Sequence, residues 1–388
     1  MKPAARIAAA AEILDYIFSG EPAEKVLTGW ARRSRFAGSK DRAAIRDIVF
    51  DALRKRNSYA ARGGALTGRA VMLGRAVLQG EPVEEIFSGE RFALAELSEA
   101  ERKAISQDLA EKVINLPDWV VTQIADENGE EAAQEIGVAL EERAQVFVRA
   151  NLLKATPENA IERLGAEGVI GVPHPHVRTA IKITEGARLL ASSTAYQEGY
   201  VEVQDASSQA AVALLPLEQG DNVLDYCAGG GGKALAIAAR TKSQVDAYDI
   251  SFGRMKDIPS RATRAGAEIT CHQQPPEQLY DLVFCDAPCS GSGTWRRTPD
   301  MKWRFSEARM VALQAQQAEV LRKAAPLVRA GGFLAYATCS ILRAENFAQV
   351  KAFVDDSGEF SLVDDHSWPV SEEGDGFYLA ILQKQNTL

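Results

Sequence analysis

Residues 223–233 decide the fold, and they read Val223-Leu224-Asp225-Tyr226-Cys227-Ala228-Gly229-Gly230-Gly231-Gly232-Lys233. An apolar run that ends in glycines before a helix-forming segment predicts a strand, a tight turn and the start of a helix. Four successive glycines let the backbone approach a ligand closely and leave amides to bind it. Asp249 ends the next predicted strand, where a carboxylate can accept both hydroxyls of a ribose. The pattern therefore predicts a nucleoside-containing ligand.

The sequence on both sides of this turn alternates between strands and helices, which is typical of a parallel sheet covered by helices. We predict strands at 222–228, 244–250, 268–273, 281–287 and 331–340, a last edge strand at 377–382, and helices at 232–240, 251–265 and 307–328. Such α/β sheets bind ligands beyond the carboxyl ends of their strands. Functional side chains are therefore expected at those ends.

The chain divides into three predicted segments: a helical domain at 1–143, a small α+β unit at 144–200, and an α/β domain at 201–388. Helix-forming residues dominate the first 115 or so, and a second helical stretch covers 127–142. The α+β unit should begin with a strand at 146–151, followed by a helix capped by Thr156.

Charge is unevenly distributed along the chain. Between Lys25 and Arg75, thirteen basic residues stand against three aspartates, a net charge of +10, although the whole chain carries −9. From Asp355 to Asp375 there are eight acidic residues and no Lys or Arg. A concentrated basic stretch is typical of phosphate binding and favours a nucleic-acid partner. A solvated helix face rich in arginine is the alternative.

Cysteine content and hydropathy restrict the class of protein. The five cysteines are odd in number and include no CxxC pair, so we expect neither a disulfide framework nor a structural zinc. His174 and His176 lie among prolines and predict a turn rather than a metal site. No apolar run approaches the roughly 20 residues of a membrane span. We therefore expect a cytoplasmic protein without membrane or metal partners.

Two cysteine motifs end predicted strands. They are Asp286-Ala287-Pro288-Cys289-Ser290-Gly291-Ser292-Gly293 and Ala337-Thr338-Cys339-Ser340. A thiolate that adds to carbon 6 of a cytosine activates carbon 5 toward a methyl sulfonium, which requires a nucleophilic cysteine, an acid and a base. One aspartate and two cysteines supply such groups. Strand cysteines usually pack in the core, which is our interpretation of Cys271 and Cys285.

The glycine turn and the two cysteine motifs, in this order, resemble the RNA cytosine-5 methyltransferases of the Sun/Nop type. The similarity extends to residues 204–209, 296–303 and 375–378, and residues 39–47 resemble the NusB-like domain of bacterial ribosomal RNA methyltransferases in this family. It thus covers nearly the whole chain. The resemblance implies a Rossmann-like S-adenosylmethionine-dependent methyltransferase core behind an N-terminal, all-helical NusB-like domain that binds RNA.

The resemblance also implies roles for individual residues. Cys339 would be the nucleophile, Cys289 would assist release of the methylated base, and Asp286 would contact both base and cofactor. The opposite assignment, with Cys289 as the nucleophile, is the alternative. The residues implied for S-adenosylmethionine are Cys227, Ala228, Gly229, Gly230, Gly231, Gly232, Lys233, Asp249, Arg254 and Asp286. The implied substrate is a cytosine of 16S ribosomal RNA, naked or in a partial particle, bound by a monomer.

The sequence departs from the family at two places. Gly230 stands where the family usually has proline, and a four-glycine turn should lose more conformational entropy on binding. Residues 271–277 lack the aspartate that the family carries near the adenine, although Gln274 or a backbone amide can replace it. We therefore expect weak but measurable cofactor binding. A non-catalytic RNA-binding or ribosome-assembly factor with this fold is the alternative function.

Further RNA contacts are expected on the segment after the first cysteine motif. Its four basic side chains should contact phosphate or solvent, and its two tryptophans should either stack on bases or pack in the core. These residues are Trp295, Arg296, Arg297, Lys302, Trp303 and Arg304.

Overall fold

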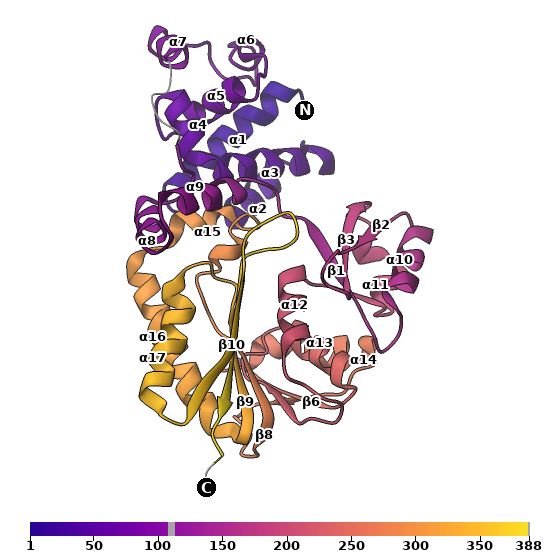
Figure 1. Cartoon of the computed structure of the whole chain (residues 1–388). Helices are drawn as coiled ribbons and strands as arrows, with labels where there is room; N and C mark the ends of the chain where they lie inside the picture. The colour runs from indigo at the N-terminus through magenta and orange to yellow at the C-terminus, as the bar shows by residue number, and fades with distance from the viewer. Residues whose placement is uncertain (108–112, 387–388) are drawn as a thin grey trace. The chain divides into compact units, whose positions relative to one another are not determined.

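The computed structural model describes residues 1–107 and 113–386, which form two compact units (Figure 1). Unit 1 comprises Met1–Arg143 and Trp295–Ser306, and unit 2 comprises Ala144–Thr294 and Glu307–Leu388. The predicted helical stretch and the predicted third domain also cover residues 108–112 and 387–388, which lie outside the described residues.

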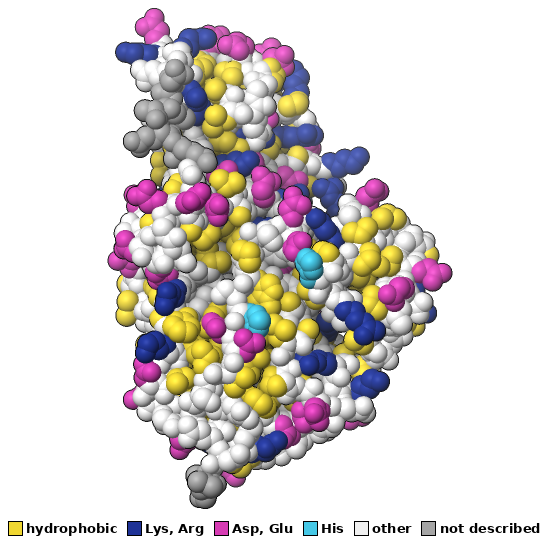
Figure 2. Space-filling model, viewed as in Figure 1, with side chains coloured by type: hydrophobic (Ala, Val, Ile, Leu, Met, Phe, Trp, Pro, Cys, Tyr) yellow, Lys and Arg dark blue, Asp and Glu magenta, His cyan; other side chains and the backbone are white. Residues whose placement is uncertain are grey.

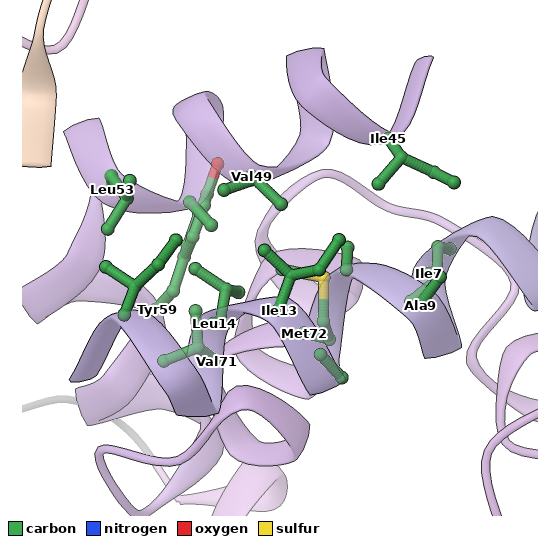
Figure 3. Close-up of a cluster of buried hydrophobic side chains, with 14 of the residues drawn as sticks. Ile7, Ala9, Ile13, Leu14, Ile45, Val49, Leu53, Tyr59, Val71 and Met72 are labelled. Carbon is green, nitrogen blue, oxygen red and sulfur yellow. The ribbon is translucent and has the colours of Figure 1, made fainter. Parts of the chain in front are cut away.

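Unit 1 is helical, as predicted for the described residues. Its helices are α1 (Pro3–Phe18), α2 (Ala23–Arg33), α3 (Ser39–Arg54), α4 (Arg56–Gly63), α5 (Gly68–Leu78), α6 (Val83–Ile86), α7 (Glu99–Ser106), α8 (Asp118–Asn128), α9 (Glu130–Ala139) and α15 (Pro299–Arg304). Apolar side chains of α1, α3 and α5 form its core (Figure 3). Leu14, Val49 and Val71 are fully buried there, because each lies on the apolar stripe of its helix.

The segment Trp295–Ser306 packs within unit 1, although the predicted division places it in the α/β domain. The indole Nε1 of Trp303 donates to the Leu53 carbonyl at 2.7 Å. The ammonium of Lys302, which is fully buried, donates to the Arg54 carbonyl at 3.1 Å. Arg296 is also buried, and Trp295 packs at 5.9 Å from the ring of Phe305.

The expectation that Arg296 and Lys302 meet phosphate or solvent is therefore wrong, because the helical unit buries both side chains. Core packing is the correct alternative for Trp295, whose side chain is also buried.

Part of the basic stretch is paired with carboxylates. Salt bridges join Arg46 to Glu24, Arg69 to Glu101, and Arg75 to Asp51 and Glu81. Figure 2 shows basic side chains interleaved with acidic ones on the face that it views. Five basic residues at the end of α2 and the start of α3 are exposed instead: Arg32, Arg33, Arg35, Lys40 and Arg42.

Unit 2 begins with a four-stranded antiparallel sheet in the order β2-β3-β1-β4. Its elements are β1 (Val146–Ala150), α10 (Pro157–Ala166), β2 (Ile170–Pro173), β3 (Ala180–Glu185), α11 (Thr194–Gln197) and β4 (Val201–Val203). The Thr156 hydroxyl accepts from the Asn159 amide at 3.3 Å, and Pro157 opens α10. This confirms the predicted cap.

A seven-stranded sheet forms the rest of unit 2, in the order β10-β11-β9-β8-β5-β6-β7. Its strands are β5 (Val223–Asp225), β6 (Val245–Tyr248), β7 (Ile269–His272), β8 (Tyr280–Asp286), β9 (Val328–Thr338), β10 (Phe360–Trp368) and β11 (Phe377–Lys384). Strands β5 to β9 are parallel, whereas β11 is antiparallel to both neighbours.

Helices cover both faces of this sheet (Figure 1). Helices α12 (Ala206–Leu214), α13 (Gly232–Thr241) and α14 (Ile258–Ala265) pack on one face, and α16 (Glu307–Ala324) and α17 (Phe347–Ser357) pack on the other. The predicted Rossmann-like α/β architecture is confirmed. Among the described residues, no helix has the length and apolarity that crossing a bilayer requires.

The predicted edge strand is interior. β11 lies between β9 and β10, and β10 forms the edge. Residues 361–365 of β10 are all exposed, so the sequence there lacks the apolar alternation that identifies a strand.

Candidate active site

A cavity of about 410 Å³ opens at the carboxyl ends of the central strands of unit 2. It is lined by the glycine turn after β5, by the end of β8, by the loop after β9 and by the loop before β11. Nine predicted site residues line it: Cys227, Ala228, Gly229, Gly230, Gly232, Lys233, Arg254, Asp286 and Cys339. Gly231, Asp249 and Cys289 lie outside the lining.

The glycine turn requires glycine at Gly229 and Gly231, whose φ angles are +49° and +80°. A Cβ at Gly231 would also meet the Ile258 side chain at 2.7 Å, so this residue faces helix α14 rather than the cavity. The turn leads directly into α13, whose first backbone amides point toward its N-terminal end. The arrangement suits an anionic or polar ligand.

Asp249 supports the turn from inside the protein. Its carboxylate is buried and accepts from the Gly229 amide at 3.0 Å and from the Ser251 amide at 2.9 Å. The exposed guanidinium of Arg254 lies 3.1 Å from the same carboxylate. A ribose would therefore use the lone pairs that these contacts leave on Asp249.

Asp225, the last residue of β5, is a feature of the cavity that the sequence analysis missed. Its side chain is buried, and neither carboxylate oxygen has a hydrogen-bond partner of good geometry among the described residues, although the backbone amide of Ala234 acts to lower its pKa. Burial and, next, the charge of Asp286 raise the pKa of Asp225 to about 7. A buried carboxylate without a partner is costly, so this site suits a ligand that brings a cation or a hydrogen-bond donor.

Lys233 and Asp286 form an ion pair across the cavity, with Nζ and Oδ2 2.6 Å apart. The charge of Asp286, acting against burial, raises the pKa of Lys233. The lysine therefore stays charged, and it lines the same cavity as Cys339.

The two motif cysteines come together, with Sγ atoms 3.5 Å apart. Of the two, Cys339 lines the cavity. The hydrogen bond to Cys339, followed by burial, raises the pKa of the Cys289 thiol well above its usual value. Cys289 should therefore keep its proton. Cys285 is fully buried, as predicted for a core cysteine.

A buried carboxylate fixes the loops that follow both cysteines. Glu345 accepts from the Ser290 amide at 2.8 Å and from the hydroxyls of Ser290 and Ser340, the latter at 2.5 Å. It also accepts from Gln317 Nε2 at 3.0 Å. Because Ser290 follows Cys289 and Ser340 follows Cys339, Glu345 sets the distance between the two thiols.

Two glycines bring a third loop to the cavity. The Gly293 amide donates to the Cys339 carbonyl at 3.0 Å, and the Gly376 amide donates to the Gly293 carbonyl at 3.1 Å. A Cβ on Gly293 would lie 2.2 Å from the Gly376 carbonyl oxygen, so only glycine allows this approach. The segments 204–208 and 375–377 reach the cavity in this region.

Other residues line the cavity without having been proposed individually: Val203, Gln204, Asp205, Ser208, Arg261, Thr294, Asp375, Gly376 and Phe377. Most of them fall in the segments 204–209 and 375–378, which the family resemblance covers, so that resemblance could have identified them as site residues. Arg261 had no such signal. Gln274, which was one of two expected substitutes for the missing aspartate beside a backbone amide, is exposed and lies outside the lining.

The sheet order, the glycine turn after β5 and the carboxylate after β6 define the class, which is a Rossmann-like α/β domain with a site for a nucleoside-containing ligand. Residues 212–383 match the family described as 16S rRNA methyltransferase RsmB/F, and residues 116–189 match the ferredoxin-like domain of RsmF/B-like methyltransferases. The chain belongs to the RsmB/F family. This confirms the predicted family, fold class and class of cofactor.

Curated relatives agree with this assignment, and solved structures share the fold. The chain is 34% identical over 286 residues to ribosomal RNA small subunit methyltransferase B of Salmonella arizonae, and 33% identical over 285 residues to that of Serratia proteamaculans. Each alignment spans 69% of this chain and 66% of the relative. The crystal structure of PH0851 superposes with a TM-score of 0.76 over 99% of both chains at 23% identity. That of NSun6 from Pyrococcus horikoshii gives 0.63 over 70% of this chain and 99% of NSun6, at 18% identity.

Proposed function

We propose that this chain transfers a methyl group from S-adenosylmethionine to carbon 5 of a cytosine in 16S ribosomal RNA, through a covalent bond between Cys339 and the base. One observation carries the proposal: the Cys339 thiol shares a cavity with the glycine turn and lies 3.5 Å from the Cys289 thiol. A nucleophile, a second thiol and a cofactor turn thus meet at one place.

The cavity fits the cofactor. The turn at 227–233 would hold S-adenosylmethionine, and Asp249 would accept its ribose hydroxyls. The unpartnered carboxylate of Asp225 would receive its ammonium group. When bound, the cofactor supplies an electrophilic methyl group. Arg254 is a weaker candidate, because its side chain is 60% exposed and already pairs with Asp249.

The protein side chains would act in sequence. Cys339 bonds to carbon 6, and Asp286, held by Lys233, binds the edge of the ring and contacts the cofactor. Carbon 5 then carries the electron density that accepts the methyl group, and a base removes its proton. Cys339 leaves as the thiolate. The Cys289 S–H donates to this leaving sulfur, which is how Cys289 would assist release.

The helical segment 1–143, which resembles a NusB-like domain, and the α+β segment 144–200 would bind the RNA. The exposed residues Arg32, Arg33, Arg35, Lys40 and Arg42 provide phosphate contacts, and Phe36 among them is 76% exposed, as a base-stacking side chain would be. The target cytosine would leave its stack to enter the cavity. We propose that a monomer acts on naked RNA or on a partial particle.

Trapping of the covalent intermediate tests this proposal. With RNA and cofactor, Cys289→Ala should accumulate a protein–RNA adduct on a denaturing gel, and Cys339→Ala should form none. The reverse pattern would exchange the two roles. Tritiated methyl transfer to naked and particle-bound RNA, followed by bisulfite sequencing, would identify the base.

A non-catalytic RNA-binding or ribosome-assembly factor is the second candidate. The exposed position of Gln274 favours it, since that residue does not replace the missing aspartate at the cavity. RNA binding without methyl transfer on either substrate would support this function over the first.

A further inference from the structure

Two arginines hold backbone carbonyls of the glycine turn. Arg261 of α14 donates from Nη1 to the Gly230 carbonyl. Arg149 of β1 donates from Nη1 to the Gly232 carbonyl at 2.9 Å. Because these carbonyls flank Gly231, the two guanidinium groups fix the turn on both sides of its most constrained glycine.

Both arginines are held in turn. Arg261 donates from Nη2 to the Glu202 carboxylate at 3.0 Å, and that carboxylate is only 1% exposed. Arg149 is 4% exposed and also donates to the Gln204 side chain. Burying a guanidinium costs free energy that its contacts must offset. The chain therefore retains one buried guanidinium, that of Arg149, and one partly buried guanidinium, that of Arg261, beside the glycine turn.

The turn needs such support. Four glycines in a row lose more conformational entropy on ordering than any other residues. Asp249 fixes the Gly229 amide, and the Ala228 carbonyl accepts from the Gly231 amide at 2.8 Å, but neither contact holds the Gly230 carbonyl. The carbonyl contacts from Arg261 and Arg149 restrict the remaining peptide planes.

We propose that Arg149 and Arg261 are positioning residues that hold the glycine turn in its cofactor-binding conformation, with Glu202 anchoring Arg261. The identity of the ligand rests on the proposed function, whereas the effect on the turn does not. This arrangement supplies the rigidity that proline at position 230 would otherwise give. It also connects the four-stranded sheet, whose strands β1 and β4 carry Arg149 and Glu202, to the cofactor turn.

Arg264 provides a matched control. It lies on the same helix, binds the same Glu202 carboxylate and has a similar side-chain exposure, 21% against 24% for Arg261. Its guanidinium donates to Glu202 and lies 4.5 Å from the centre of the Tyr196 ring, rather than contacting the turn. Arg261→Ala and Arg264→Ala each remove one ion pair with Glu202, and only the first removes a contact to Gly230.

Hydrogen exchange of the cofactor-free protein is the first measurement. Amides 229–233 should exchange about tenfold faster in Arg261→Ala than in wild type, and within twofold of wild type in Arg264→Ala, as expected for one lost charge-assisted hydrogen bond. Equal acceleration in both variants would overturn the proposal, because the effect would then belong to the Glu202 ion pairs.

Cofactor binding is the second measurement. By calorimetry, Arg261→Ala should raise the Kd for S-adenosylmethionine about tenfold and Arg264→Ala less than twofold, with KM rising in the same ratio and kcat at saturating cofactor preserved. A raised Kd without faster exchange would also overturn the proposal, since Arg261 lines the cavity and would then act by direct contact. If the wild-type protein binds no S-adenosylmethionine, the proposed function is wrong. The hydrogen-exchange rates of amides 229–233 then decide by themselves whether the arginines hold the turn.

The variant Arg149→Lys tests the role of the second arginine separately from that of Arg261. Lysine keeps the charge, but its single ammonium does not reproduce the planar guanidinium contacts with Gly232 and Gln204. Exchange at 229–233 should rise at least threefold in this variant. An unchanged rate in a folded Arg149→Lys protein would remove Arg149 from the proposal.

Discussion

Replacing Asp225 with asparagine should stabilise the cofactor-free protein at pH 8 and weaken its cofactor binding. The carboxylate is 1% exposed, and burial followed by Asp286 raises its pKa from 3.8 to about 7. At pH values between about 4 and 7, Asp225 keeps a proton in the folded chain that it has lost in the unfolded chain. The contribution of Asp225 to stability is thus complete below about pH 4 and is lost as the pH rises through about 7.

The size of the effect follows from the shift in pKa. A shift of about three pKa units, at about 1.4 kcal/mol per unit, gives an upper limit of about 4 kcal/mol for the gain in stability at pH 8. We expect a gain of about 2–4 kcal/mol. Urea unfolding of wild type and Asp225→Asn from pH 4 to pH 8 measures it: the difference in free energy should grow with pH and level off above 7. Asp257→Asn, at an exposed carboxylate, is the control and should change stability by less than about 0.5 kcal/mol.

The same variant should lose cofactor affinity, because asparagine cannot neutralise an ammonium group. We expect the Kd for S-adenosylmethionine to rise about tenfold or more at pH 8, as for a charge-assisted hydrogen bond. In wild type, binding near pH 7 should release a proton, visible as a heat that depends on the buffer. If the free energies of unfolding of wild type and Asp225→Asn changed with pH in the same way, and the two proteins bound the cofactor with equal Kd, the assignment of an unpartnered carboxylate to this cavity would be refuted.

Three further predictions test other parts of the structure. Glu345→Gln should slow adduct formation at least tenfold and cost about 3 kcal/mol, because an amide cannot accept all the donors around it. The control Glu319→Gln, at a partly exposed carboxylate that forms only surface ion pairs, should do neither. Burial lowers the pKa of Lys302 to about 7, so the free energy of unfolding should rise with pH between about 7 and 10.5. In urea unfolding, Lys302→Met should be about 1–3 kcal/mol more stable than wild type at pH 7, and its stability should not show this rise with pH. By calorimetry, Asp249→Asn should raise the cofactor Kd about tenfold and Arg254→Ala less than threefold; equal effects would show that the ion pair, not the carboxylate alone, forms the site.

Local chemistry made much of the fold predictable. The strand, turn and helix at 223–241 follow from residues adjacent in sequence, as does the Thr156 cap of α10. β10 was missed because residues 361–365 face solvent and carry no apolar alternation. The place of Trp295–Ser306 in unit 1 depends on contacts with α3, more than 240 residues earlier, such as that between Trp303 and Leu53. No local pattern encodes such a contact.

The site divides in the same way. Its motif residues were predictable because each ends an apolar strand, and parallel strands bring their carboxyl ends together. Asp225 was overlooked because the sequence does not show whether an aspartate at the end of a strand has a hydrogen-bond partner. Only the structure shows that its carboxylate is buried without one of good geometry. Arg149 and Arg261 were overlooked because arginine is read as a surface residue, whereas here it binds backbone carbonyls.

The choice between the two cysteines as nucleophile, open on the motifs alone, now has a physical basis. Cys339 lines the cavity near the charged Lys233, whereas Cys289 lies outside the lining with its pKa raised by the hydrogen bond to Cys339 and by burial. A thiol that keeps its proton cannot attack, but it can donate to the sulfur that does. This predicts that the rate of adduct formation by Cys289→Ser should remain within about tenfold of wild type, since serine still donates a hydrogen bond. Loss of adduct formation in Cys289→Ser, with the adduct retained in Cys339→Ser, would assign the attack to Cys289 instead.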